Sequence, residues 1–220
     1  MGKYVFVLTR PAEQELPDFG DVLRSESGPA IRDDAPGLAG LRIVLREPAT
    51  AAPDADAVDG ADAVVELWVG PDHVPLDSTT KRLESSTSSV QGWRVSEEVV
   101  VDALGQDPRP VDMFAFIQRL DGTSPEFFAT NWRIHGTGAA TLAREQSCSW
   151  RYLQNRVLEP VTPTRWVIDG YGSFRGEGPS LPESDDPAHM PGEEPFWRVT
   201  SRLMLGRELY AHDQTRRDAQ

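Results

Sequence analysis

The sequence contains a single cysteine, Cys148, and very little lysine. One cysteine cannot form a disulfide within the chain or build a cysteine-based metal site, so a reducing cytoplasm is the expected location. Lys3 and Lys81 are the only lysines, and nearly all of the 22 basic residues are therefore arginines. Together with the abundant Ala, Asp and Pro, this preference indicates a GC-rich bacterial genome.

Long hydrophobic runs are also missing. The N-terminal stretch "MGKYVFVLTRP" has five apolar residues in a row before Thr9 and Arg10, which is too short for the core of a signal peptide. No later stretch approaches the roughly 18 apolar residues of a membrane-spanning helix. We therefore expect a protein that is neither exported nor associated with a membrane.

Positive charge is scarce relative to negative charge. The chain carries 22 basic and 35 acidic residues, a formal net charge of −13. Phosphate backbones and anionic lipids would repel such a chain, which argues against nucleic acid or a membrane surface as a partner. With 39% hydrophobic residues, six Trp and eight Phe, the chain still has enough apolar material for a core.

An internal repeat is the most informative positive feature. Three pairs of segments match in the same order along the chain: 4–10 with 113–119, 62–68 with 169–175, and 92–103 with 196–207. The third pair includes "WRVS" against "WRVT". Such a pattern predicts two copies of one unit of about 100 residues. The stretch "LGQDPRPVD" between them suits a linker, so the expected units are residues 1–104 and 112–212.

Each copy is expected to run as strand, helix, strand, strand, variable region and strand. In the second copy the predicted strands are 113–119, 150–158, 167–175 and 196–209. A helix is predicted from a capping hydroxyl at 123–124, with Pro125 in the first turn, to about residue 146. The intervening segment 176–195 is rich in Pro, Gly and acid and is expected to be a surface loop. This order predicts an α+β, ferredoxin-like unit.

The predicted helix carries one histidine on its apolar side. Phe128, Trp132, His135, Ala139 and Leu142 follow a spacing of 4, 3, 4 and 3, which is typical of a buried stripe. The first copy has no Trp or His in the corresponding segment, so the unit does not need His135 merely to fold. A core histidine and a working histidine are therefore both open interpretations.

"SPEFFATNWRIHG" followed by "WRYLQNRVLEP" resembles the EthD family of dimeric α/β-barrel proteins. Members carry a W-x-x-x-H helix motif and then a strand with arginine, an aromatic, an aliphatic and Gln-Asn. The spacing from Trp132 to His135 is one residue shorter than that motif, whereas the strand matches as Arg151 to Asn155. The resemblance covers residues 112–175 and reaches the first copy only through the repeat.

The resemblance implies a fold and a class of ligand. Two four-stranded sheets pack face to face into a barrel with helices outside, and a tandem chain can build this barrel from its own two halves. The expected fold is therefore two ferredoxin-like units in an intramolecular dimeric α/β-barrel. Members are similar to small cofactor-free enzymes that bind aromatic or polyketide-like molecules between sheet and helices.

The candidate site is centred on His135. Gly136 and Gly138 follow it, and because glycine destabilises helices, they suggest that space beside the histidine is kept open. The expected substrate contacts are Trp132, Tyr152, Asn155, Tyr171 and Arg119. Tyr152 and Asn155 should point to opposite faces of their strand, so at most one should share a cavity with His135. For Tyr171 and Arg119, a snorkelling or ion-paired side chain is the competing interpretation.

Two functions remain open. In the first, the protein is a cofactor-independent lyase, cyclase or isomerase acting on an aromatic or polyketide-like carbonyl compound, with His135 as general acid or base. In the second, the same cavity carries a small hydrophobic molecule without chemistry, or haem ligated by His135. No cofactor and no metal site are expected, and the protein should be a monomer or a homodimer of complete barrels.

Overall fold

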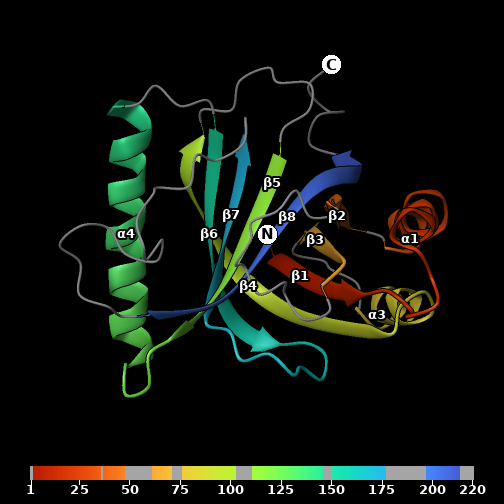
Figure 1. Ribbon diagram of the computed structural model, residues 1–220, viewed down its shortest axis with the longest axis horizontal. Helices are drawn as coiled ribbons and strands as arrows, with labels where there is room; N and C mark the ends of the chain where they lie inside the picture. The colour runs from red at the N-terminus through yellow and green to blue at the C-terminus, as the bar shows by residue number, and fades with distance from the viewer. Residues whose placement is uncertain are drawn as a thin grey trace.

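The computed structural model describes residues 2–35, 37–47, 61–70, 76–102, 111–145, 150–176 and 197–213, with side chains except at 142–145, 150, 197–205 and 213. Their strands form one closed antiparallel barrel. Figure 1 shows helix α4 on one side of this barrel and helices α1 and α3 on the other. The predicted loop at 176–195 lies almost entirely outside the described residues.

The first unit supplies four strands and a set of short helices. In chain order the elements are β1 (Gly2–Thr9), α1 (Leu16–Val22), the π-helical turn η1 (Leu23–Ser27), α2 (Gly28–Asp34), β2 (Leu38–Arg46), β3 (Ala63–Val69), α3 (Asp77–Glu84) and β4 (Ser89–Asp102). Pro17 and Pro29 fall in the first turns of α1 and α2, where a missing N–H costs no helical hydrogen bond. Pro17 therefore starts a helix, whereas Pro29 lies where η1 continues directly into α2.

The second unit follows the order that the sequence predicts. Its elements are β5 (Val111–Arg119), α4 (Pro125–Glu145), β6 (Trp150–Pro160), β7 (Gly170–Gly176) and β8 (Trp197–Asp213). The predicted strand boundaries agree with these to within about three or four residues, as expected when strands are read from alternation alone.

The strand order shows how two units make one barrel. The first sheet runs β4-β1-β3-β2 and the second runs β8-β5-β7-β6, which is the same order for corresponding strands. Antiparallel pairs β2 with β8 and β4 with β6 join the sheets at both edges. The predicted α+β fold, two ferredoxin-like units in an intramolecular dimeric α/β-barrel, is confirmed. The unit boundary stays a prediction, because residues 103–110 lie outside the described part of the chain.

Equivalent hydrogen bonds recur in the two units. The backbone N–H of Arg10 donates to Asp62 Oδ2 at 2.9 Å, and the N–H of Arg119 donates to Asp169 Oδ2 at 2.9 Å. These are the same positions that the first two repeat segments match. Each aspartate also forms an ion pair with the same arginine. Arg10 Nε lies 3.5 Å from Asp62 Oδ1, and Arg119 Nη1 lies 3.4 Å from Asp169 Oδ1.

The third repeat match is wrong. Val5 pairs with Trp93 across β1 and β4, whereas its repeat counterpart Phe114 pairs with Met204 across β5 and β8. Trp93 therefore corresponds to Met204 and not to Trp197. The shared "WRV" is a local coincidence, because β8 is longer than β4 and Trp197 pairs with Arg119 near its far end.

Alternating side chains divide the core into separate layers. Tyr4, Phe6 and Leu8 of β1 pack outward against the helices of the first unit. Val5 and Val7 of the same strand point into the barrel, where they meet side chains of the second unit such as Phe114 and Phe116. Apolar contact inside the barrel therefore joins the two units.

Candidate functional site

Helix α4 begins as the sequence predicts. The Ser124 hydroxyl accepts a hydrogen bond from the backbone N–H of Phe127 at 3.1 Å, and Pro125 is the first helical residue. The capping hydroxyl satisfies one of the backbone donors that the first turn leaves unpaired. This cap and the proline fix where α4 starts, and hence which residues face the sheet.

The apolar stripe of α4 is slightly rotated from the prediction. Phe128, Trp132, Gly136 and Ala139 are buried, whereas His135 is half-buried. His135 therefore lies on the flank of the stripe and not at its centre. The side chain of Leu142, also placed on the stripe by the sequence, lies outside the described side chains.

Contacts of neighbouring residues show which way this flank faces. Arg133 lies about 200° away from His135 by the helical period, and its Nε is 3.8 Å from a carboxylate oxygen of Glu98 on β4. Phe128, on the His135 side of the stripe, packs in one cluster with Ile117 of β5. Because β5 and β4 lie on opposite sides of the β7-β6 pair, the His135 flank faces β7 and β5.

The His135 ring lies on an aromatic column. Its centroid is 5.8 Å from that of Trp132, with 13° between the ring planes, and Trp132 stacks in turn on Phe128 at 5.8 Å and 16°. Trp132 is 5% exposed and Phe128 2%. The histidine is thus the most exposed ring of the column, with an apolar support beneath it.

The space beside Gly136 is filled, contrary to the sequence interpretation. A Cβ at this position would lie 2.8 to 2.9 Å from the amide atoms of Gln154 on β6. The Gln154 Nε2 group donates to the Trp132 carbonyl oxygen at 2.6 Å and to the Tyr152 hydroxyl at 3.1 Å. Gly136 therefore allows close contact between helix and sheet; it does not leave a cavity.

The predicted site residues divide between two faces of the second sheet. Tyr152 lies under α4, where it packs in one cluster with Ala139, and its ring stacks on Phe174 at 4.2 Å. Asn155 points into the barrel, as the alternation predicts, and its Oδ1 accepts a hydrogen bond from Lys3 Nζ at 3.0 Å. Tyr171 is also inside the barrel, with no exposed surface.

Arg119 is not part of either group. It lies at the end of β5, paired with Asp169. Because Arg10 and Asp62 form the same pair in the first unit, the pair serves the fold of both units. The ion-paired interpretation of Arg119 thus has a specific structural basis, and its proposed contact with substrate stays a prediction.

The barrel interior holds charged residues that the sequence analysis missed. We name them the interior charge cluster: Lys3, Arg42, Glu66, Glu97, Asp112, Arg175 and Glu208. Glu66 is central, since its carboxylate lies 2.7 Å from Lys3 Nζ and 3.0 Å from Arg42 Nη1. The Tyr171 hydroxyl donates to it at 3.0 Å. Arg42 also pairs with Asp112 of the second unit, so the cluster joins the two sheets.

Burial and charge act in opposite directions on the carboxyls of this cluster. Burial alone would raise the pKa of Glu66, but Lys3 and Arg42 outweigh it and hold the pKa below its ordinary value. For Asp112, burial prevails over the nearby Arg42 and raises the pKa. Burial and the Glu66 carboxylate raise the pKa of Tyr171 well above its ordinary range, so this phenol stays protonated and donates.

A sequence signal for the cluster exists. Lys3, Glu66 and Asp112 are single charges in the apolar strands "KYVFV", "VVELWV" and "VDMFAF". Alternation puts each on the face opposite the helices. A lone charge on a strand is also typical of a half-exposed sheet, and only closure of the barrel brings these charges together.

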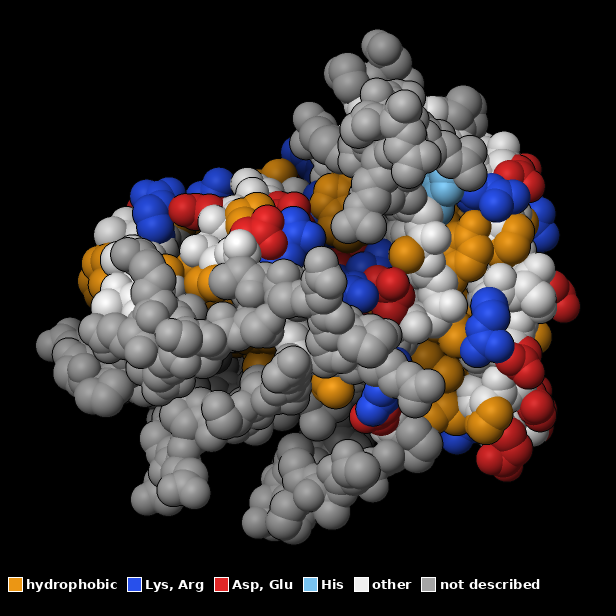
Figure 2. Space-filling view, turned by 90° about the horizontal axis from the view of Figure 1, so that it is seen from above, with side chains coloured by type: hydrophobic (Ala, Val, Ile, Leu, Met, Phe, Trp, Pro, Cys, Tyr) orange, Lys and Arg blue, Asp and Glu red, His pale blue; other side chains and the backbone are white. Residues whose placement is uncertain are grey.

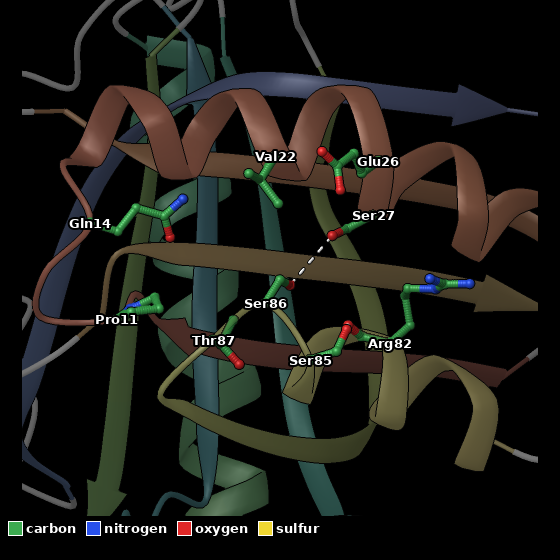
Figure 3. Close-up of a pocket in the computed structure, with 9 residues that line it drawn as sticks. All are labelled: Pro11, Gln14, Val22, Glu26, Ser27, Arg82, Ser85, Ser86 and Thr87. Atoms are coloured by element: carbon green, nitrogen blue, oxygen red, sulfur yellow. Dashed lines mark hydrogen bonds between the residues drawn. The ribbon is translucent and has the colours of Figure 1, made fainter.

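A separate pocket of about 340 Å³ opens in the first unit (Figure 3). Its lining residues are Pro11, Gln14, Val22, Glu26, Ser27, Arg82, Ser85, Ser86 and Thr87. The hydroxyls of Ser85, Ser86 and Thr87 donate to carbonyl oxygens of Arg82 and Leu83 in the last turn of α3. These hydroxyls therefore cap a helix, and none of the predicted site residues lines this pocket.

Within the described residues, no group of three or more His, Cys, Asp or Glu side chains could hold a metal ion. None of the described helices is long and apolar enough to span a membrane. Figure 2 shows acidic and basic side chains interspersed among the described residues of the face seen from above.

The fold is similar to solved structures of very different sequence. An anthrone oxidase-like protein is 10% identical, with 96% of this chain and 92% of that chain covered and a TM-score of 0.58. A variant chlorite dismutase from Candidatus Nitrospira defluvii is 10% identical, with 94% and 91% covered and a TM-score of 0.51. No protein-family model and no curated protein matches the sequence. At such low identity the similarity establishes the fold alone, and membership of the EthD family stays a prediction.

Proposed function

We propose that the protein is a cofactor-independent enzyme, of the EthD-like lyase, cyclase or isomerase type, that acts on an aromatic or polyketide-like carbonyl compound. The observation that supports this most is the half-buried His135 ring stacked on buried Trp132, on the flank of α4 that faces β7 and β5. His135 is a titratable group with both an apolar support and access to solvent. The other described histidine, His212, has no aromatic ring stacked on it among the described residues.

The chemistry we assign to His135 is proton transfer at a carbon that a carbonyl group makes acidic, either next to the carbonyl or, as in anthrone, across the ring from it. Histidine as a residue type changes charge near neutral pH, so it can take a proton from one atom and return it to another. The flat face of an aromatic substrate can pack along the Trp132 side of the site. Removal of the proton gives an enolate, which is the common first step of isomerisation, cyclisation and elimination next to a carbonyl.

The choice of ligand class has some support from the fold similarity. The anthrone oxidase-like protein is named for an aromatic ketone, and its chain and this one align over nearly their whole lengths. Tyr152 lies between α4 and the sheet, on the same face of the sheet as His135, and is placed to contact such a ligand. Asn155 and Tyr171 remain candidate contacts only for a molecule that enters the barrel, because both point to its interior.

Deuterium exchange tests this assignment directly. The protein would be incubated with anthrone and related aromatic ketones in D2O, and deuterium gained at the carbonyl-activated carbon, which in anthrone is the ring methylene opposite the carbonyl, would be followed by mass spectrometry. We expect His135→Gln to keep the fold, because the amide can retain a hydrogen bond, and to lower the exchange rate by roughly 10² to 10⁴. His212→Gln is the matched control, since His212 is also half-buried but lies on β8.

Three other outcomes would replace the proposal. Destabilised His135→Gln protein with undiminished exchange per folded molecule would make His135 a structural residue. Binding of anthrone by wild type without exchange would favour the accessory binding protein, and a haem absorbance band lost in His135→Gln would identify haem as its ligand.

A further inference from the structure

We propose that Gln154 is a positioning residue for His135, acting through the backbone of Trp132. This inference rests on the proposed role of His135 and adds a residue to that site. Gln154 lies on β6, under the middle of α4, and its side chain is 2% exposed. A buried side-chain amide is costly unless it is hydrogen-bonded, so the partners of this amide indicate why it is there.

The amide nitrogen of Gln154 connects helix to sheet. It donates to the Trp132 carbonyl oxygen at 2.6 Å and to the Tyr152 hydroxyl oxygen at 3.1 Å. In a helix the Trp132 carbonyl already accepts from the N–H of the residue four positions on, which is Gly136. Gln154 uses the second lone pair of this carbonyl and so holds one turn of α4 against the strand.

Gly136 leaves the room that this contact needs. A Cβ there would lie 2.8 Å from Gln154 Oε1 and 2.9 Å from Nε2, closer than such atoms approach in folded proteins. Any larger residue would displace the amide or lift the helix. A glycine inside a helix is otherwise unfavourable, so the pair is best explained by the close approach that it permits.

The turn of α4 that Gln154 holds against the sheet is the one that includes His135. His135 follows Trp132 by three residues, and the two rings stack with 13° between their planes. Fixing the Trp132 backbone therefore fixes the surface on which the His135 ring lies. Small errors in the placement of a reacting group reduce rates strongly. Gln154 therefore sets the distance of the His135 ring from the sheet and the orientation of that ring.

The test uses Gln154→Met and Gly136→Ala in the full chain. Methionine keeps the length of glutamine and removes both donors, whereas alanine keeps the amide but intrudes on it. The readout is the His135 ring resonances in histidine-labelled protein, identified by their loss in His135→Gln. These resonances sense the ring current of Trp132. We expect both variants to move them toward unstacked values and to lower ketone exchange by about 10- to 100-fold.

Gln91→Met is the matched control. Gln91 is 6% exposed, and its Oε1 accepts hydrogen bonds from the N–H groups of Arg165 and Trp166 at 2.7 and 3.0 Å. It lies on β4 of the first unit, so Gln91→Met should leave the His135 resonances and the exchange rate per folded molecule unchanged. Unchanged resonances and exchange are the result expected of a variant that loses stability without displacing the His135 ring.

Unchanged His135 resonances in folded Gln154→Met and Gly136→Ala would overturn the proposal. Failure of both variants to fold, with Gln91→Met folded, would also overturn it by showing that the contact serves the fold only. The spectra need no substrate, so they report on positioning even if His135→Gln retains full exchange. In that case the proposed function fails while the positioning inference is judged separately.

Discussion

At the scale of single residues, Glu66 is the carboxylate that joins two cations of the interior charge cluster. It is fully buried and shares its carboxylate between Lys3, Arg42 and the Tyr171 hydroxyl. Replacing a buried ion pair as a whole can be nearly neutral, but removing one partner leaves uncompensated charge in a poorly solvated place. The cost of losing Glu66 therefore falls on the two cations that remain.

We expect Glu66→Gln to lower the free energy of unfolding by about 3 kcal/mol, the low end of the cost of breaking a buried ion pair, because Lys3 keeps Glu97 and Arg42 keeps Asp112 and Glu208 as partners. Urea denaturation at neutral pH measures this. Glu159→Gln is the control, since Glu159 pairs with Arg94 at 2.9 Å on the surface, with both side chains about half exposed. Such exposed pairs contribute roughly 0 to 1 kcal/mol. Equal losses in the two variants would contradict the central place of Glu66.

The loss of unfolding free energy in Glu66→Gln should depend on pH, and the direction of the Glu66 pKa shift gives its sign. The folded-state pKa of Glu66 is held below its ordinary value of 4.5, so its contribution is fully present above that value. It is lost as the pH falls through the lower folded-state pKa. The difference between wild type and Glu66→Gln should therefore shrink under acid, below about pH 4.5. A difference that grows on acidification would reverse the assigned shift.

At the scale of secondary structure elements, the boundaries of α4 were predictable and its exact orientation was not. A cap, a proline and a periodic stripe are local signals, so the sequence locates the helix correctly at Pro125–Glu145. The rotation that buries Gly136 and leaves His135 half-buried depends on Gln154, which lies on a separate strand. Side-chain spacing alone cannot reveal that contact.

We expect Ser124→Ala to lower the free energy of unfolding by about 0.5 to 2 kcal/mol, because the N–H of Phe127 loses its acceptor. Thermal unfolding measures the loss. Thr123→Ala is the control: it is the neighbouring hydroxyl, and the structure gives Thr123 no side-chain hydrogen bond. A larger loss at Thr123 than at Ser124 would mean that the cap is misassigned.

At the scale of the whole molecule, the repeat predicts the architecture because each copy preserves the same strand order. The two repeat matches that end in the recurring Arg and Asp pairs are structural equivalents, whereas the "WRV" match is not. The single charges on the strands are visible in the sequence, but their ion pairs could not be predicted, since these join residues as distant as Arg42 and Asp112 across the two units. These contacts exist only once the barrel is closed.

The position of a bound ligand distinguishes the His135 site from the first-unit pocket and from the barrel interior. The most direct measurement is a crystal structure of the full chain with anthrone bound. We expect anthrone between α4 and the outer face of β7 and β5, with its methylene carbon, opposite the carbonyl, about 3 to 3.5 Å from a ring nitrogen of His135. Anthrone bound instead in the first-unit pocket lined by Ser27 and Arg82, or inside the barrel beside Glu66, would contradict the account.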